Sequence, residues 1–151
     1  MNLDRFTVKS QEALERAQRI ARENGNPDLG NFHLLAALLT EDESPVAAVL
    51  EKLGARREAI ANEVAEALGR LPRVQGGSMR AGPAFVATLD HAEDIAQSLK
   101  DEFVSVEHLL LALAEPDADD AAKLTSAAAR AHAAVLPFRA TPAGWLLTLR
   151  F

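Results

Sequence analysis

The chain has 151 residues, of which 48% are hydrophobic and 25% charged, so it is long enough to form one soluble domain with a real core. Its formal net charge is −6, which argues against a nucleic-acid partner because phosphate binding needs a basic face. It has no cysteine, which excludes disulfides and thiolate metal sites, and its apolar runs are too short to span a bilayer. The opening MNLDRFT lacks the apolar segment of a signal peptide, so we expect a cytoplasmic location and no membrane partner.

Four helices are expected in the first part of the chain. Apolar residues recur on a single helical stripe in the first, and the second is apolar nearly all round, which is typical of a buried helix. Thr7 is placed to cap the first helix, while Ser44 and Pro45 are typical of a cap and a first helical residue. The expected helices cover residues 7–23, 31–40, 45–53 and about 56–68.

The pattern then stops and starts again. Residues 70–83 contain two prolines and three glycines without a helical period, which predicts a linker. Residues 83–100 then repeat the first helix, and VEHLLLALA repeats the second. Within residues 14–38, nine residues are identical to those 75 positions later, all of them on the apolar stripes or in the histidine-leucine phrase: Leu14/Leu89, Ala17/Ala92, Ile20/Ile95, Ala21/Ala96, His33/His108, Leu34/Leu109, Leu35/Leu110, Ala37/Ala112 and Leu38/Leu113.

This duplication predicts an all-α fold of two pseudo-symmetric four-helix repeats. We place the first repeat at residues 1–69, the linker at 70–82 and the second repeat at 83–124. The second repeat is incomplete or altered at its C-terminal end, because the similarity fails after Leu124.

The tail, residues 125–151, diverges from the repeat. Alanine-rich residues 119–135 favour a helix, and the final GWLLTLRF alternates as a short strand does, without a partner strand upstream. We hypothesise that the tail is not a native element of the fold. A shifted reading frame, a natural truncation and a rewired C-terminus remain open.

No catalytic or metal-binding motif is present. The chain has no phosphate-binding loop, no nucleophile elbow and no zinc-protease motif, and its four histidines lack metal-ligand spacing. We therefore expect no enzymatic activity, no cofactor and no metal. His33 and His108 each lie in the first turn of a buried helix, so we interpret them as structural groups at a corner between helices, with a ligand or catalytic role as the alternative.

Three polar residues at exposed helix ends are candidates for a surface site. By their positions alone Thr7 is a helix cap, Glu107 is favoured by a helix N-terminus, and Asp101 is a solvated loop charge. Two helical repeats also meet along a seam, and seams with apolar walls and charged rims bind extended peptides in other proteins.

Several phrases together identify a family resemblance. MNLDRFT, HLLAALL, ALGRLPRVQG and DEFVSVEHLLLALAE, in this order, resemble the N-terminal domain of Clp/AAA+ chaperones over residues 1–124. LGRLPRVQG resembles the ClpB disaggregases more than ClpA or ClpC. The resemblance implies a mobile helical domain that binds unfolded or aggregated polypeptide and passes it to a hexameric AAA+ motor, without hydrolysing ATP itself. The alternative is an N-domain of the ClpA/ClpC type, on which an adaptor protein docks.

The resemblance also implies a site. In the ClpB family a threonine after LDR-[FL], an aspartate before the sixth helix and a glutamate at the start of that helix form a surface important for chaperone activity. These positions match Thr7, Asp101 and Glu107, which are therefore the expected peptide-binding residues.

Overall fold

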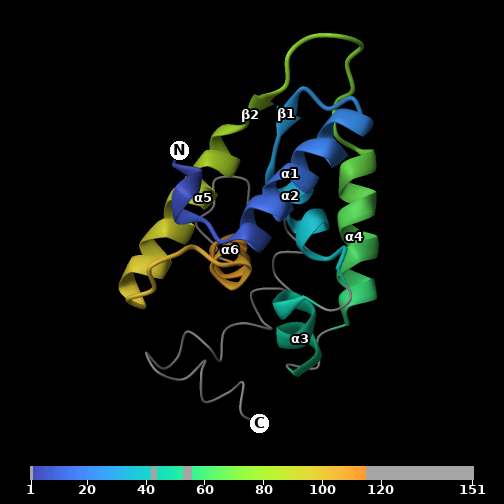
Figure 1. The fold of residues 1–151 in the computed structure, drawn as a ribbon. Coiled ribbons are helices and arrows are strands. Elements are labelled where there is room, and N and C mark those ends of the chain that lie inside the picture. Colours follow the sequence, from blue (N-terminus) through green and yellow to red (C-terminus); the bar gives the residue numbers. More distant parts are fainter. Residues whose placement is uncertain (1, 42–43, 53–55, 115–151) are drawn as a thin grey trace.

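The structure of the protein is a computed structural model that describes residues 2–41, 44–52 and 56–114 (Figure 1). This part of the chain is mainly helical, which confirms the all-α expectation. Its elements are the 3₁₀ turn η1 (Leu3–Arg5), the helices α1 (Val8–Glu23), α2 (Asn31–Leu38), α3 (Pro45–Lys52), α4 (Arg57–Gly69), α5 (Pro83–Ser98) and α6 (Val106–Leu113), and the strands β1 (Asp28–Leu29) and β2 (Arg80–Ala81). The later helices expected for the second repeat and the expected terminal strand lie outside the described residues.

The helices begin where the sequence predicted. Thr7 Oγ1 accepts a hydrogen bond from the backbone N–H of Ser10 at 3.2 Å, which caps α1. Ser44 Oγ accepts from the N–H of Ala47 at 3.0 Å, and Pro45 is the first residue of α3. Each cap satisfies a backbone donor that the first turn of a helix leaves without a partner.

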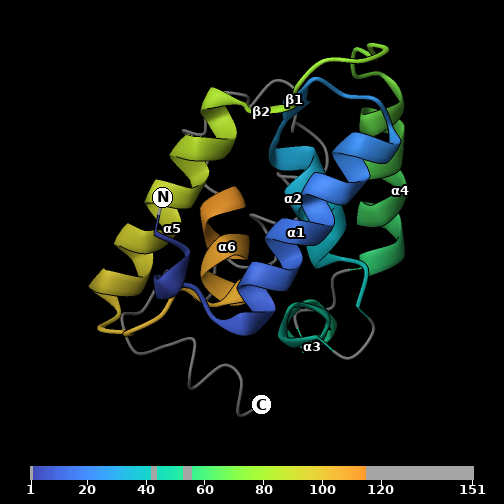
Figure 2. The same cartoon turned by 45° about the horizontal axis from the view of Figure 1, so that its top comes forward.

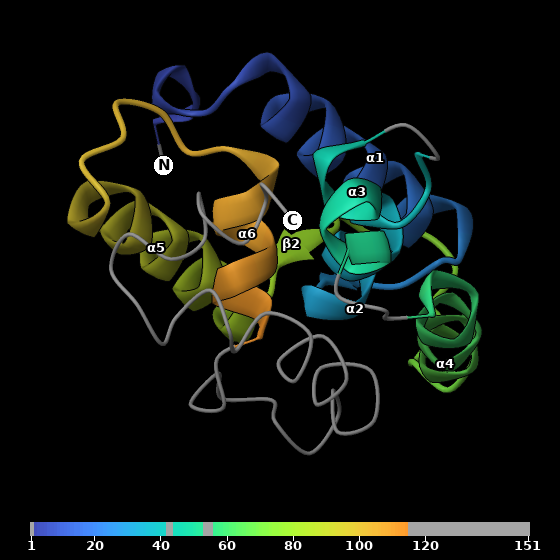
Figure 3. The same cartoon turned by 90° about the horizontal axis from the view of Figure 1, so that it is seen from below.

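The duplicated helices form two matched pairs. α1 packs on α2, and α5 packs on α6, so that the same pair of helices occurs once in each repeat. Figure 2 shows α6 lying between α5 and α1, and the view from below in Figure 3 shows α5 and α6 on one side and α2 and α4 on the other. The leucines of the repeated phrase are buried, and burial of each side chain contributes about 1.5–3 kcal/mol.

The linker differs from the expectation of irregular chain. Within it, β2 pairs with β1 in parallel, with Leu29 opposite Ala81. A second parallel bridge joins Phe6 to Val104. The two pairings are copies of each other, because Phe6 and Ala81 are 75 residues apart, as are Leu29 and Val104. Each repeat is thus entered by a segment that is hydrogen-bonded to the other repeat.

Hydrogen bonds next to these bridges also repeat. The Gly82 N–H donates to the Leu29 carbonyl at 2.8 Å, and the Thr7 N–H donates to the Val104 carbonyl at 3.0 Å. The turns after α1 and α5 match as well, since the N–H of Asn26 and the N–H of Asp101 each donate at 2.9 Å to a carbonyl five residues earlier. The two repeats therefore share backbone geometry as well as apolar residues.

Candidate functional site

The two repeated histidines have the same surroundings in both repeats. The ring Nδ1 of His33 accepts from the N–H of Gly30 at 2.9 Å, and that of His108 accepts from the N–H of Ser105 at 2.9 Å. On the other side of the ring, Nε2 of His33 lies 2.9 Å from Asn26 Oδ1, and Nε2 of His108 lies 2.8 Å from Asp101 Oδ2. Each imidazole therefore joins the start of a buried helix to the turn that precedes it.

This geometry supports the structural interpretation of the histidines. Both rings are buried, and both ring nitrogens have protein partners. Burial lowers the pKa of His33 below its ordinary value, and the backbone hydrogen bond from Gly30 only partly opposes this effect. His33 is thus held as a neutral imidazole that accepts at Nδ1 and donates at Nε2.

We call Thr7, Asp101 and Glu107 the polar corner. Val104 connects them, because its carbonyl accepts a hydrogen bond from the Thr7 N–H and it lies between Asp101 and Glu107 in sequence. Glu107 is in the first turn of α6, after the cap residue Ser105. η1 and the start of α1 lie beside the loop that connects α5 to α6 (Figure 1).

Asp101 differs from the expected solvated loop charge. Its carboxylate binds His108, while its side chain remains 44% exposed. It therefore has a structural partner and a face that is open to solvent. Thr7 also has a structural role as a cap, and its hydroxyl donates to Ser10 Oγ at 2.9 Å.

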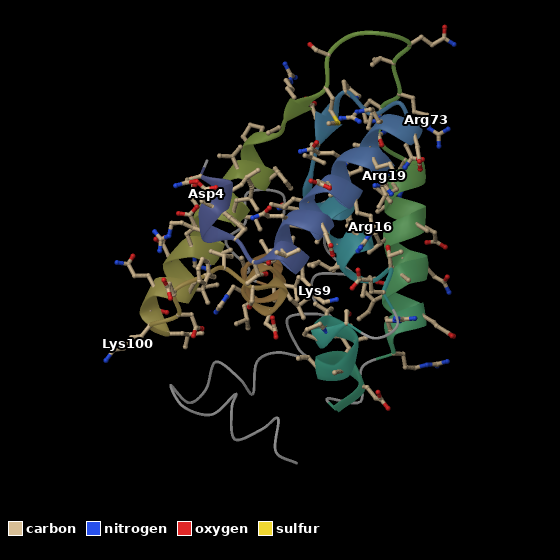
Figure 4. All side chains as sticks on the ribbon, in the orientation of Figure 1. Asp4, Lys9, Arg16, Arg19, Arg73 and Lys100 are labelled. Carbon is tan, nitrogen blue, oxygen red and sulfur yellow. The ribbon has the colours of Figure 1, made fainter. Side chains whose placement is uncertain are left out.

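Exposed apolar side chains adjoin the polar corner. Val8, which follows Thr7, is 70% exposed, and Phe103, two residues after Asp101, is 46% exposed. Leu3 in η1 is also exposed. Lys100 follows the C-terminal end of α5 and points away from the molecule, while Asp4 projects from η1 (Figure 4). Large apolar side chains at the surface beside charged groups are a feature of protein-binding sites.

The residues 75 positions away from the polar corner form a second, different corner. Thr7 corresponds to Gly82, Asp101 to Asn26 and Glu107 to Phe32. We call the set Asn26, Phe32 and Gly82 the apolar corner. All three residues line a pocket of about 600 Å³ between the β1–β2 pair and the N-termini of α2 and α5. At its edge, Arg80 and Asp28 form an ion pair. The sequence did not predict this pocket, although the spacing of 75 pairs its three residues with those of the polar corner.

The described residues show neither a candidate metal site nor a membrane-spanning element. Within residues 2–41, 44–52 and 56–114, no group of three or more histidine, cysteine, aspartate or glutamate side chains could hold a metal ion. No helix in that part of the chain is both long enough and apolar enough to cross a membrane.

The chain is similar to known proteins in sequence. Residues 5–128 match the family described as the Clp repeat (R) N-terminal domain. The chaperone protein ClpB of Nitratidesulfovibrio vulgaris is 39% identical over 123 residues, which are 78% of this chain and 14% of that protein. ClpB of Mycobacterium tuberculosis (strain H37Rv) is 37% identical over 121 residues, again 14% of its length. The chain thus spans only a small part of the length of these relatives.

Solved structures show the same fold. The Hsp104 N-terminal domain from Candida albicans matches with a TM-score of 0.73 and 22% identity, and covers 89% of this chain and 91% of that one. A ClpV N-domain in complex with a VipB peptide matches with a TM-score of 0.65 and 22% identity, over 82% of this chain and 79% of that one. The family match, the ClpB relatives and the shared fold agree: this chain belongs to the Clp N-terminal domain family.

Proposed function

We propose that this domain binds unfolded or aggregated polypeptide at the polar corner, as the substrate-binding N-terminal domain of a ClpB-type disaggregase. In a longer protein it would pass the bound chain to a hexameric AAA+ motor. The observation that carries the proposal is the position of the exposed Val8 and Phe103 next to Thr7, Asp101 and Glu107. The identity with ClpB relatives supports it, as does the VipB peptide bound to a ClpV N-domain of the same fold.

The duplication supplies an internal comparison for the polar corner. The fold needs an acceptor for the Nε2–H of each histidine, and in the first repeat the neutral Asn26 supplies it. Asp101 supplies the same acceptor in the second repeat, with a negative charge that this bond does not require. Glu107 likewise occupies the position of the buried Phe32. Both negative charges exceed what the repeated packing needs, which favours a role in binding.

The sharpest test separates the charge of Asp101 from its structural bond. In the Asp101→Asn variant the amide oxygen can still accept from His108, as Asn26 accepts from His33, so the fold should remain intact. We expect binding of unfolded casein, measured by NMR titration of the full chain, to weaken by several-fold. The Glu107→Gln variant should weaken it similarly, because each loses a charge from the same surface.

The matched control is Glu66→Gln, which removes an exposed carboxylate from α4, away from the polar corner. This variant should bind casein as the unmodified chain does. Equal weakening by all three variants would indicate a general charge effect and would contradict the proposal. Capture of one folded partner at fixed stoichiometry, with no casein binding, would instead favour an adaptor-docking domain of the ClpA/ClpC type.

A further inference from the structure

The two corners differ in one aromatic side chain. At the polar corner, Phe6 enters the core from the bridge with Val104 and is only 2% exposed. At the apolar corner, the matching bridge residue is Ala81, which is exposed and lines the pocket. The backbone pairing is therefore the same at both corners, whereas the phenylalanine side chain is present at only one of them.

The pocket at the apolar corner has mainly apolar walls. Phe85 takes the position that Ser10 has in the first repeat, so part of the space around Ala81 is filled by another aromatic ring. A volume of about 600 Å³ nevertheless stays open. Other walls are supplied by Leu29, Phe32 and Pro83, so a large apolar side chain has a favourable environment here.

Asn31 contributes a polar side chain to the wall of this pocket. It lines the pocket and is 4% exposed, and its Nδ2 donates to the carbonyl of Ala84 at 3.4 Å. Its Oδ1 has no hydrogen-bond partner within the described part of the chain. Buried acceptors are normally satisfied, but this oxygen is itself enclosed, so an N–H donor on an occupant reaches it only when the Asn31 side chain turns toward the pocket. The corresponding residue at the polar corner is Val106, which needs no donor.

We propose that the pocket at the apolar corner binds one large apolar side chain, phenylalanine or leucine, from an extended segment of an unfolded polypeptide. When the Asn31 side chain turns toward the pocket, a backbone N–H group of that segment supplies its missing donor. The chain itself shows what such a corner accepts, because the extended segment around Phe6 fills the other corner. This inference rests on the proposed function, and it adds a second binding site with a different preference from the charged polar corner.

The test uses the full chain and two short fluorescent peptides of glycine and serine, one with a central phenylalanine and one with a central alanine. We expect the phenylalanine peptide to bind about tenfold or more tightly than the alanine peptide, since the ring becomes buried. Its addition should shift the NMR signals of Gly30, Phe32 and Gly82. The Ala81→Phe variant, which supplies the missing ring, should weaken the phenylalanine peptide about tenfold.

Glu66→Gln is the matched control, because Glu66 is exposed on α4, belongs to neither corner and should leave the binding of the phenylalanine peptide unaffected. Equal affinity for both peptides, or signal shifts confined to residues around Val104, would overturn the inference. If Ala81→Phe proves unfolded by circular dichroism, the residues whose NMR signals shift in the unmodified chain decide whether the peptide binds at the apolar corner. Casein binding that is lost in Asp101→Asn but retained in Ala81→Phe, with no phenylalanine preference, would leave the proposed function intact and reject the second site.

Discussion

Lys100 has a backbone conformation that suits glycine. Its φ is 61°, and the matching residue in the first repeat is Gly25, with a φ of 68°. A side chain in this left-handed region costs about 1–2 kcal/mol, partly offset by the greater flexibility of glycine in the unfolded chain. We predict that Lys100→Gly raises the free energy of unfolding by about 0.5–1 kcal/mol, measured by urea denaturation followed by circular dichroism.

The first repeat offers the reverse substitution as a control. Gly25→Ala places a Cβ in the same conformation and should lower the free energy of unfolding by about 1 kcal/mol. If Lys100→Gly instead destabilises the domain, the lysine side chain makes a contribution that outweighs its backbone conformation.

His33 gives the domain a defined sensitivity to acid. Because burial lowers its pKa in the folded state below the ordinary value of 6.5, the unfolded chain takes up this proton more readily. The stability that neutral His33 confers is complete above pH 6.5 and is lost as the pH falls from there through the lowered pKa. A second proton would also remove the acceptor that the Gly30 N–H uses. We predict that the urea midpoint is lower at pH 5.5 than at pH 7.5, two conditions that lie about one unit below and above the ordinary histidine pKa of 6.5.

Glu41 responds to acid in a separate and lower pH window than His33. Arg16 lowers the pKa of Glu41 through a hydrogen bond, so any stability gained from that pair is lost only in more acidic solution. A midpoint that stayed constant between about pH 7.5 and 5.5 would contradict the assigned role of His33.

Among the elements, the segment before α1 has an influence greater than its length suggests. η1 and the residues after it reach across to the second repeat, where the Val104 N–H donates to the Arg5 carbonyl at 2.7 Å. Phe6 fixes this segment to the core, because its ring is buried there. We predict that Phe6→Ala lowers the free energy of unfolding by about 3–5 kcal/mol, as measured by chemical denaturation.

Phe103→Ala is the natural comparison, since Phe103 is about half exposed and precedes Val104, the partner of Phe6 in the bridge. It should change the free energy of unfolding by no more than about 0.5 kcal/mol. Similar effects of the two substitutions would show that the N-terminal segment is not anchored through Phe6.

Elements with strong local signals were predictable from the sequence, and short ones were not. Thr7 and Ser44 indicate where their helices begin, because capping is a local interaction. The strands β1 and β2 have two residues each, too few to show an alternating pattern, and they pair across a long stretch of sequence. The site was predictable in the same measure: the structural role of the histidines followed from the repeat, whereas Asn26 and Asp101 became their partners only through the turn geometry.

At the scale of the whole molecule, the two repeats are interlocked rather than merely adjacent. The first repeat contributes Phe6 to the bridge at the second, and β2, just before α5, pairs with β1 of the first. α6 additionally contacts α1, α2 and α3. The core is therefore shared, because each repeat buries part of its apolar surface against the other.

Gly76 and Gly77 in the connection offer a way to test this interlocking. Both have positive φ values, and a side-chain carbon added to either residue would have open space around it. A protease site inserted between them should be cleaved without disturbing either repeat. We predict that the two fragments co-elute in gel filtration after cleavage and unfold in a single transition, because each carries half of both cross-repeat bridges. Fragments that separated without denaturant would show that the repeats are independent units, and the pocket between them could not then be a stable feature of the domain.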